Sequence, residues 1–163
     1  MYTKFAAVIS YPMRLEDEIK QPTFQSEAHK AYLNVVYTAG WLGQRQMAAF
    51  KPYGLTSPQF NVLRILRGQH PLPATVALLI ERMLDKTSNA SRIVDKLEEK
   101  KLVTRTVCPA NRRAVDIRIT EAGLRLLRQI DEDEQANPAR SSLDKLTVAE
   151  QRQLNTLLDK IRA

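Results

Sequence analysis

The middle of the chain concentrates side chains that donate hydrogen bonds or bear positive charge. Between Arg82 and Arg118 there are ten basic and five acidic residues, a surplus of five in a chain whose formal net charge is +7. A surplus of this sign favours an acidic polymer as partner. The side chains in this stretch that are suited to contact such a polymer are Ser88, Asn89, Ser91, Arg92, Lys96, Arg105, Arg112 and Arg113.

The first of these side chains have the chemistry needed to bind duplex DNA. Arginine can form two hydrogen bonds to guanine, asparagine can do the same with adenine, and serine can bond to either base. Ser88, Asn89 and Arg92 are therefore candidates for contact with base edges, whereas Lys96 and Arg105 are candidates for contact with phosphates. Taken alone, the stretch is equally consistent with a solvated cationic surface.

A helix predicted over residues 87–101 positions most of these side chains. Its apolar residues recur at i, i+3, i+4 and i+7, and they are Ala90, Ile93, Val94 and Leu97. This spacing places them on one face that packs inward. The polar candidates therefore occupy the opposite face and the first turn. A helix of this kind fits the major groove of B-DNA, with its N-terminal residues near the bases.

After this helix the apolar period changes from 3.6 to 2, which predicts two short strands over residues 102–108 and 114–119. The connection, residues 109–113, places Arg112 and Arg113 at the tip of a hairpin. Such a wing, residues 103–119, can insert cationic side chains into a neighbouring minor groove.

Further helices are expected on both sides of this segment. A long helix with a broad apolar stripe is predicted over residues 26–51, and it ends at Pro52–Gly54. The next, from about 57 to 67, begins either with a capping box from Thr56 to Gln59 or with Ser57 as N-cap before Pro58. Three more are predicted: a short helix over 74–83, one that begins near 120, and a last one opened by a capping box from Thr147 to Glu150.

Five segments together resemble one known family in their order and spacing. They are Phe60–Leu66, Ser91–Glu98, Lys101–Val103, Asn111–Val115 and Ile119–Gly123. In this combination the chain is similar, from about residue 30 to 160, to the multiple-antibiotic-resistance regulator (MarR) family of winged helix-turn-helix transcription factors.

The resemblance implies a homodimer, held by the first and last helices, that places two recognition helices in successive major grooves. It also implies repression or activation that responds to a small-molecule effector, through a pocket between the dimerisation and DNA-binding parts. The family's wing normally has an Asp, any residue, Arg motif. Here the corresponding residues are Asn111, Arg112 and Arg113, so the arginine is retained and the acid is not.

The expected fold class is therefore mainly α, a winged helix-turn-helix of about six helices with a two-stranded β wing. Residues 1–25 are expected to form an irregular arm and residues 26–54 the N-terminal dimerisation helix. Residues 55–122 are expected to form the DNA-binding domain and residues 123–163 the C-terminal dimerisation helices.

Other functional classes find little support in the sequence. The five glycines form no phosphate loop or nucleophile elbow. We therefore predict no catalytic residue and do not expect the protein to be an enzyme. Cys108 is the only cysteine, and His29 and His70 lie far apart, so neither a cofactor nor a metal is expected. No apolar run approaches the ~20 residues of a membrane span, and we expect a cytoplasmic protein. Tyr37 and Trp41 on the long helix are candidates for an effector pocket, and core or dimer contacts are the alternative.

These observations favour a dimeric, sequence-specific DNA-binding transcriptional regulator of MarR type. Its partners would be a pseudo-palindromic double-stranded operator, a second copy of the chain and a candidate small-molecule effector. The alternative is a winged-helix module that binds another protein and has lost DNA binding.

Overall fold

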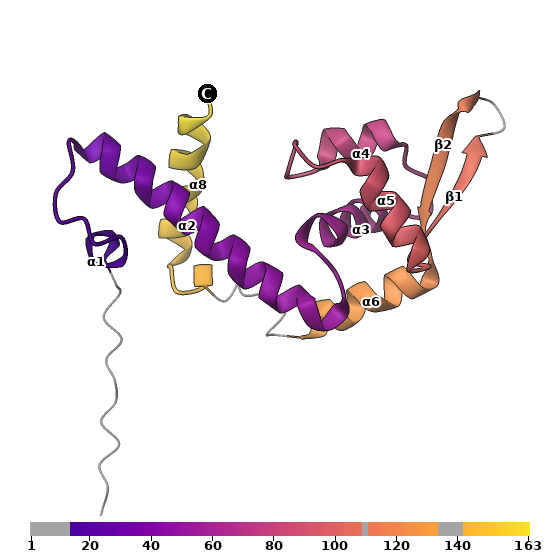
Figure 1. The fold of residues 1–163 in the computed structure, drawn as a ribbon, viewed down its shortest axis with the longest axis horizontal. Coiled ribbons are helices and arrows are strands. Elements are labelled where there is room, and N and C mark those ends of the chain that lie inside the picture. Colours follow the sequence, from indigo (N-terminus) through magenta and orange to yellow (C-terminus); the bar gives the residue numbers. More distant parts are fainter. Residues whose placement is uncertain (1–13, 109–110, 134–141) are drawn as a thin grey trace, which may run out of the picture. The chain divides into compact units, whose positions relative to one another are not determined.

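The structure is a computed structural model that describes residues 14–108, 111–133 and 142–163. The chain forms two compact units, which divide between Trp41 and Leu42 inside one long helix (Figure 1). This division lies before the boundary expected after Gly54. The reason is that Phe50, near the end of the long helix, is only 2% exposed and belongs to the core of the second unit.

The first unit contains α1 (Leu15–Glu18) and the beginning of α2 (Glu27–Phe50). The side chain of Leu15 is buried, and Lys30 Nζ lies 2.6 Å from Glu16 Oε1. The expectation of an irregular arm over residues 1–25 is therefore wrong for Leu15–Glu18, whereas residues 1–13 lie outside the described range. A run of three acids in the first turn favours this short helix, because carboxylates stabilise the positive end of the helix dipole.

The helices of the second unit surround one apolar core. They are α3 (Ser57–Gln69), α4 (Val76–Arg82), α5 (Ala90–Glu99) and α6 (Glu121–Glu132). The largest fully buried side chains are Phe50, Leu63, Leu66, Leu79, Leu97, Ile117 and Leu127. The last helix of this unit is α8 (Val148–Ile161), which begins at the predicted capping box of Thr147 and Glu150.

The start of α3 settles the choice that the sequence left open. Thr56 is the N-cap, since its Oγ1 accepts a hydrogen bond from Gln59 N at 3.3 Å, while Gln59 Oε1 accepts one from Thr56 N at 3.2 Å. The reciprocal pair satisfies two backbone donors at the helix end. Before it, α2 ends in a 3₁₀ turn, Lys51–Tyr53, and Gly54 adopts a left-handed φ of 63°.

The wing consists of β1 (Val103–Cys108) and β2 (Asn111–Ile119), which pair in antiparallel register from Val103 with Ile119 to Val107 with Val115. A third segment joins it through Ala74, which exchanges two backbone hydrogen bonds of 2.9 Å with Ile117. The sequence placed Ala74 inside the short helix. That helix begins only after Thr75, whose side chain caps it by accepting from Leu78 N.

The element order and the wing confirm the predicted fold class, a mainly α winged helix-turn-helix. None of the helices in the described part of the chain combines the length and apolar composition that crossing a membrane requires.

Candidate nucleic-acid interface

The predicted recognition helix begins three residues later than expected. Asn89 is the N-cap of α5, and its Oδ1 accepts a hydrogen bond from Arg92 N at 3.0 Å. Ser88 and Asn89 therefore precede the helix, and the expected start at residue 87 is wrong. The side-chain carbonyl oxygen of Asn89 already accepts the hydrogen bond from Arg92 N. The side-chain NH₂ of Asn89 is therefore the group best placed to contact a ligand.

The turn before α5 is organised by one carboxylate. Asp85 Oδ1 accepts hydrogen bonds from Thr87 N at 2.9 Å and Thr87 Oγ1 at 2.7 Å, and Asp85 Oδ2 accepts one from Ser88 Oγ at 2.6 Å. These bonds, that of Ser88 first among them, lower the pKa of Asp85 from 3.8 to about 2. The carboxylate is therefore ionised at neutral pH, and the Ser88 hydroxyl donates to it.

The outer face of α5 presents Ser91, Arg92 and Lys96, all exposed, while Val94 and Leu97 on its inner face are buried. Lys96 Nζ pairs with both oxygens of Glu99, at 2.8 and 2.9 Å. Within the described ranges, the guanidinium of Arg92 has no hydrogen-bond or ion-pair partner. It is therefore available to an anionic or hydrogen-bonding ligand.

Arg105 connects the wing to α5. Its Nη2 lies 2.6 Å from Asp95 Oδ1, its Nε lies 3.9 Å from Glu98 Oε2, and its side chain is 30% exposed. The sequence assigned Arg105 to phosphate contact. In the structure its charge is balanced by acids of α5, because strand and helix bring together residues ten positions apart.

A shallow groove of about 270 Å³ lies between the N-terminal ends of α3 and α5. It gathers four of the predicted residues, and these are Ser88, Asn89, Arg92 and Lys96. The α3 side of the groove contains Thr56 and Gln59, which the sequence did not nominate. Their capping-box spacing was visible, but nothing in the sequence shows that this helix end lies beside the recognition helix.

Lys100 holds the two helices of the groove together. Its ammonium group donates to Gln59 Oε1 at 2.9 Å and to the Gly54 carbonyl at 2.5 Å. Gln59 is 7% exposed, so this lysine gives a hydrogen bond to a buried amide. This polar contact therefore joins α3 and the end of α5 in addition to the apolar core that the two helices share.

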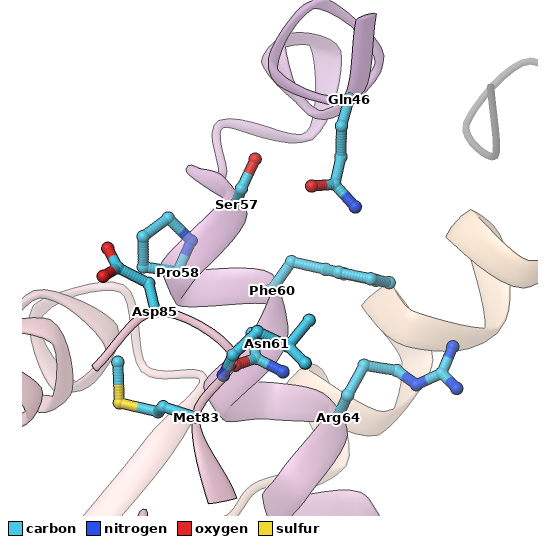
Figure 2. A pocket seen from close by; sticks show the side chains of 9 residues that line it. Gln46, Ser57, Pro58, Phe60, Asn61, Arg64, Met83 and Asp85 are labelled. Atoms are coloured by element: carbon cyan, nitrogen blue, oxygen red, sulfur yellow. Dashed lines mark hydrogen bonds between the residues drawn. The ribbon is translucent and has the colours of Figure 1, made fainter. Parts of the chain in front are cut away.

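A second cavity, of about 440 Å³, lies where the end of α2, α3 and the loop after α4 meet. Figure 2 shows Gln46 on the α2 side, Phe60 and Arg64 on α3, and Asp85 on the loop. Asn61 on α3 fixes that loop, because its Oδ1 accepts a hydrogen bond from Leu84 N at 3.0 Å. The wall of this cavity and the turn before α5 therefore share residues.

The aromatic candidates for an effector pocket lie in the first unit. Tyr37 donates its hydroxyl hydrogen to Glu18 Oε2 at 2.6 Å, and this bond raises the pKa of Tyr37 above its usual value. Trp41 is 40% exposed. Neither lines the groove or the cavity described above.

The remaining sequence predictions fall where side chains are not described. Arg112 and Arg113 belong to the backbone of β2, but their side chains lie outside the described part of the structure, as does that of Cys108. In the part that is described, no group of three or more His, Cys, Asp or Glu side chains could hold a metal ion.

Comparison with known proteins identifies the family. A model described as MarR family matches residues 53–114, which run from before α3 into β2. A crystal structure of a MarR transcription factor from Planctomyces limnophilus is 30% identical, with a TM-score of 0.64, and the match covers 84% of this chain and 98% of that one. The chain belongs to the MarR family.

Two further matches show how far the likeness extends. The transcriptional regulator MhqR of Bacillus subtilis strain 168 is 35% identical over 86 residues, which are 52% of this chain and 57% of MhqR. The chain thus matches little more than half of that relative. The structure of S. aureus MepR in complex with DNA has a TM-score of 0.68 at 21% identity, and the match covers 80% of this chain and 94% of MepR. At that identity it supports the shared fold.

Proposed function

We propose that this MarR-family protein is a dimeric, sequence-specific DNA-binding transcriptional regulator that inserts the N-terminal end of α5 into the major groove. The observation that supports this most is the exposed, unpartnered guanidinium of Arg92 on a helix whose other face is buried. Arginine in the first turn of a recognition helix can bond to guanine, whereas Ser91 and the Asn89 amide offer further polar contacts.

The wing supplies the second contact of the proposed interface. We assign Arg112 and Arg113 to the minor groove and Lys96 to phosphates, while Arg105 stays paired with α5 and holds the wing in place. The MepR–DNA complex shows that a protein of this fold binds DNA, which supports DNA as the partner. A regulator of this kind acts on chromosomal DNA, so the proposal includes a cytoplasmic location.

The proposed dimer uses apolar side chains that the single chain leaves exposed. On α2, Tyr32 is 65% and Val36 is 52% exposed, and on α8, Leu157 is 51% and Ile161 is 69% exposed. Large apolar side chains on two helices favour burial against a second copy. In size-exclusion chromatography the wild type should elute as a dimer, and Val36→Asp should shift it toward the monomer.

The proposed effector site keeps Tyr37 and Trp41 as candidate lining residues. Trp41 is the only tryptophan of the chain, so its fluorescence reports directly on ligand binding near it. An effector that releases DNA from the wild type should change this fluorescence. A released complex with unchanged Trp41 emission would place the effector elsewhere.

Arg92→Ala tests the DNA-binding proposal, with Arg128→Ala as the matched control because it removes the same charge from α6. The probe is a duplex that the wild-type protein selects from a randomised library, followed by fluorescence anisotropy at several salt concentrations. Arg92→Ala should weaken binding to this duplex by about 1–3 kcal/mol and relax its sequence preference, while Arg128→Ala should preserve the preference. The protein-interaction alternative predicts that neither the wild type nor either variant prefers any sequence.

A further inference from the structure

The turn that delivers α5 is held at three places by side chains. Leu84 N is fixed by Asn61 of α3. Lys86 Nζ donates to the carbonyls of Ile80 and Glu81 and so caps the end of α4. The carboxylate of Asp85 accepts hydrogen bonds from Thr87 and Ser88. Such a turn leaves little freedom in where the next helix begins.

Asp85 is the member of this set that acts on the start of α5. It holds Thr87 by its backbone N–H and its hydroxyl, and Ser88 by its hydroxyl. Asn89 follows directly and caps the helix through Arg92 N. Side-chain hydrogen bonds thus join Asp85 to Thr87 and Ser88, and the next residue, Asn89, is joined to Arg92 of α5.

The charge of Asp85 is unfavourable for the proposed function itself. The side chain is exposed and ionised, and it borders the cavity (Figure 2), three residues before Ser88, which lines the groove of the proposed interface. A carboxylate at such a place repels a polyanion. A favourable contribution of Asp85 to DNA binding must therefore come from geometry rather than from attraction.

We propose that Asp85 is a positioning residue for DNA recognition, which fixes Thr87 and Ser88 so that Asn89 caps α5 and Arg92 projects from its first turn. The inference rests on the proposed function, since it concerns how the same interface is held. It also gives Ser88 a different role from the one its sequence position suggests, because its hydroxyl acts through Asp85 rather than on a base.

Two substitutions of Asp85 distinguish the effect of its hydrogen bonds on DNA binding from the effect of its charge. Asp85→Ala deletes all three hydrogen bonds. Asp85→Asn removes the charge but keeps an oxygen that can accept both bonds from Thr87, and its NH₂ group can donate to the Ser88 hydroxyl oxygen in place of the bond that this hydroxyl now donates. Asp85→Ala should weaken binding to the selected duplex by about tenfold, as expected for loss of a capping interaction. Asp85→Asn should stay within about threefold of the wild type. Binding of both variants to a random duplex of equal length should be unchanged or tighter, because repulsion is removed.

A double-mutant cycle tests the role of Ser88. If the hydroxyl acts through Asp85, Ser88→Ala should cost less than Asp85→Ala, and the double variant should bind no more weakly than Asp85→Ala alone. Additive losses would mean that Ser88 contacts DNA independently and would overturn this part of the inference.

Hydrogen exchange of the free protein tests the role of Asp85 in the absence of DNA. In Asp85→Ala the amide protons of Thr87 and Arg92 should exchange with solvent faster than in the wild type, while those of α3 should not change. Unchanged exchange, or equal losses on the selected and the random duplex, would refute a positioning role. A wild type that does not discriminate the two duplexes would instead refute the proposed function.

Discussion

Gly123, in the first turn of α6, allows a strong test of how closely α6 packs against the start of the wing. A Cβ atom added at this position would lie 2.5 Å from the carbonyl oxygen of Leu102 and 2.7 Å from Ile119 Cγ1. The Leu102 carbonyl cannot move freely, because it accepts a hydrogen bond from Thr120 N at 3.0 Å. Gly123→Ala must therefore shift the backbone where β1, β2 and α6 meet.

The expected magnitude follows from three contributions. Overpacking by one methyl group costs about 1–3 kcal/mol, and weakening of the Thr120 to Leu102 hydrogen bond costs about 1 kcal/mol. The higher helix propensity of alanine offsets about 1 kcal/mol of this loss. Gly123→Ala should therefore lower the free energy of unfolding by about 1–3 kcal/mol.

Urea denaturation at one fixed protein concentration measures this change, and Gly68→Ala is the matched control. Gly68 lies in α3 with no atom within 4 Å of an added Cβ. The same substitution there should raise stability by up to about 1 kcal/mol. If Gly123→Ala proved as stable as the wild type, or gained stability as Gly68→Ala does, the close approach of α6 to the wing would be refuted.

Three further predictions concern hydrogen bonds and ion pairs. Arg105→Ala should lower the free energy of unfolding by about 1 kcal/mol, because it removes the ion pair with Asp95. It should leave the salt dependence of DNA binding unchanged, and a weaker dependence of DNA affinity on salt concentration would contradict this. Thr56→Ala should cost about 1 kcal/mol in urea denaturation through loss of the capping box, and Thr56→Ser should restore most of it. Glu16 has a pKa lowered from 4.5 to about 2, mainly by its hydrogen bond with Lys30. Its stabilising contribution is therefore present above pH 4.5 and disappears toward pH 2, so wild type and Glu16→Gln should differ in stability at pH 6 and converge near pH 2.

The sequence predicted those features that depend on neighbours along the chain. The apolar spacing of Ala90, Val94 and Leu97 identified the inner face of α5, and the capping boxes at Thr56 and Thr147 marked two helix starts. Each of these signals lies within one or two helical turns. Local periodicity and capping therefore sufficed for the order of helices and for the wing.

The features that could not be predicted from the sequence depend on a turn that competes with helix formation or on contacts between distant segments. The start of α5 moved from residue 87 to Ala90 because the Asp85 carboxylate binds Thr87 in a turn, an alternative to helical bonding. The pairing of Ala74 with Ile117 joins segments 43 residues apart, which no local pattern indicates. The helix at Leu15–Glu18 is too short to produce a periodic signal.

The structure shows that the basic side chains of the central stretch differ in how far nearby acids balance their charge. Lys96 and Arg105 are paired with acids, so their charges are largely balanced within the protein. Lys86 and Lys100 donate to neutral carbonyl or amide oxygens, so their positive charges stay uncompensated by those contacts. Electrostatic attraction to DNA therefore does not follow the count of basic residues. It depends on the basic side chains that no neighbouring acid balances, and Lys86, Lys100 and Arg92 are among them. In the proposed interface, Arg92 adds recognition of sequence to this general attraction.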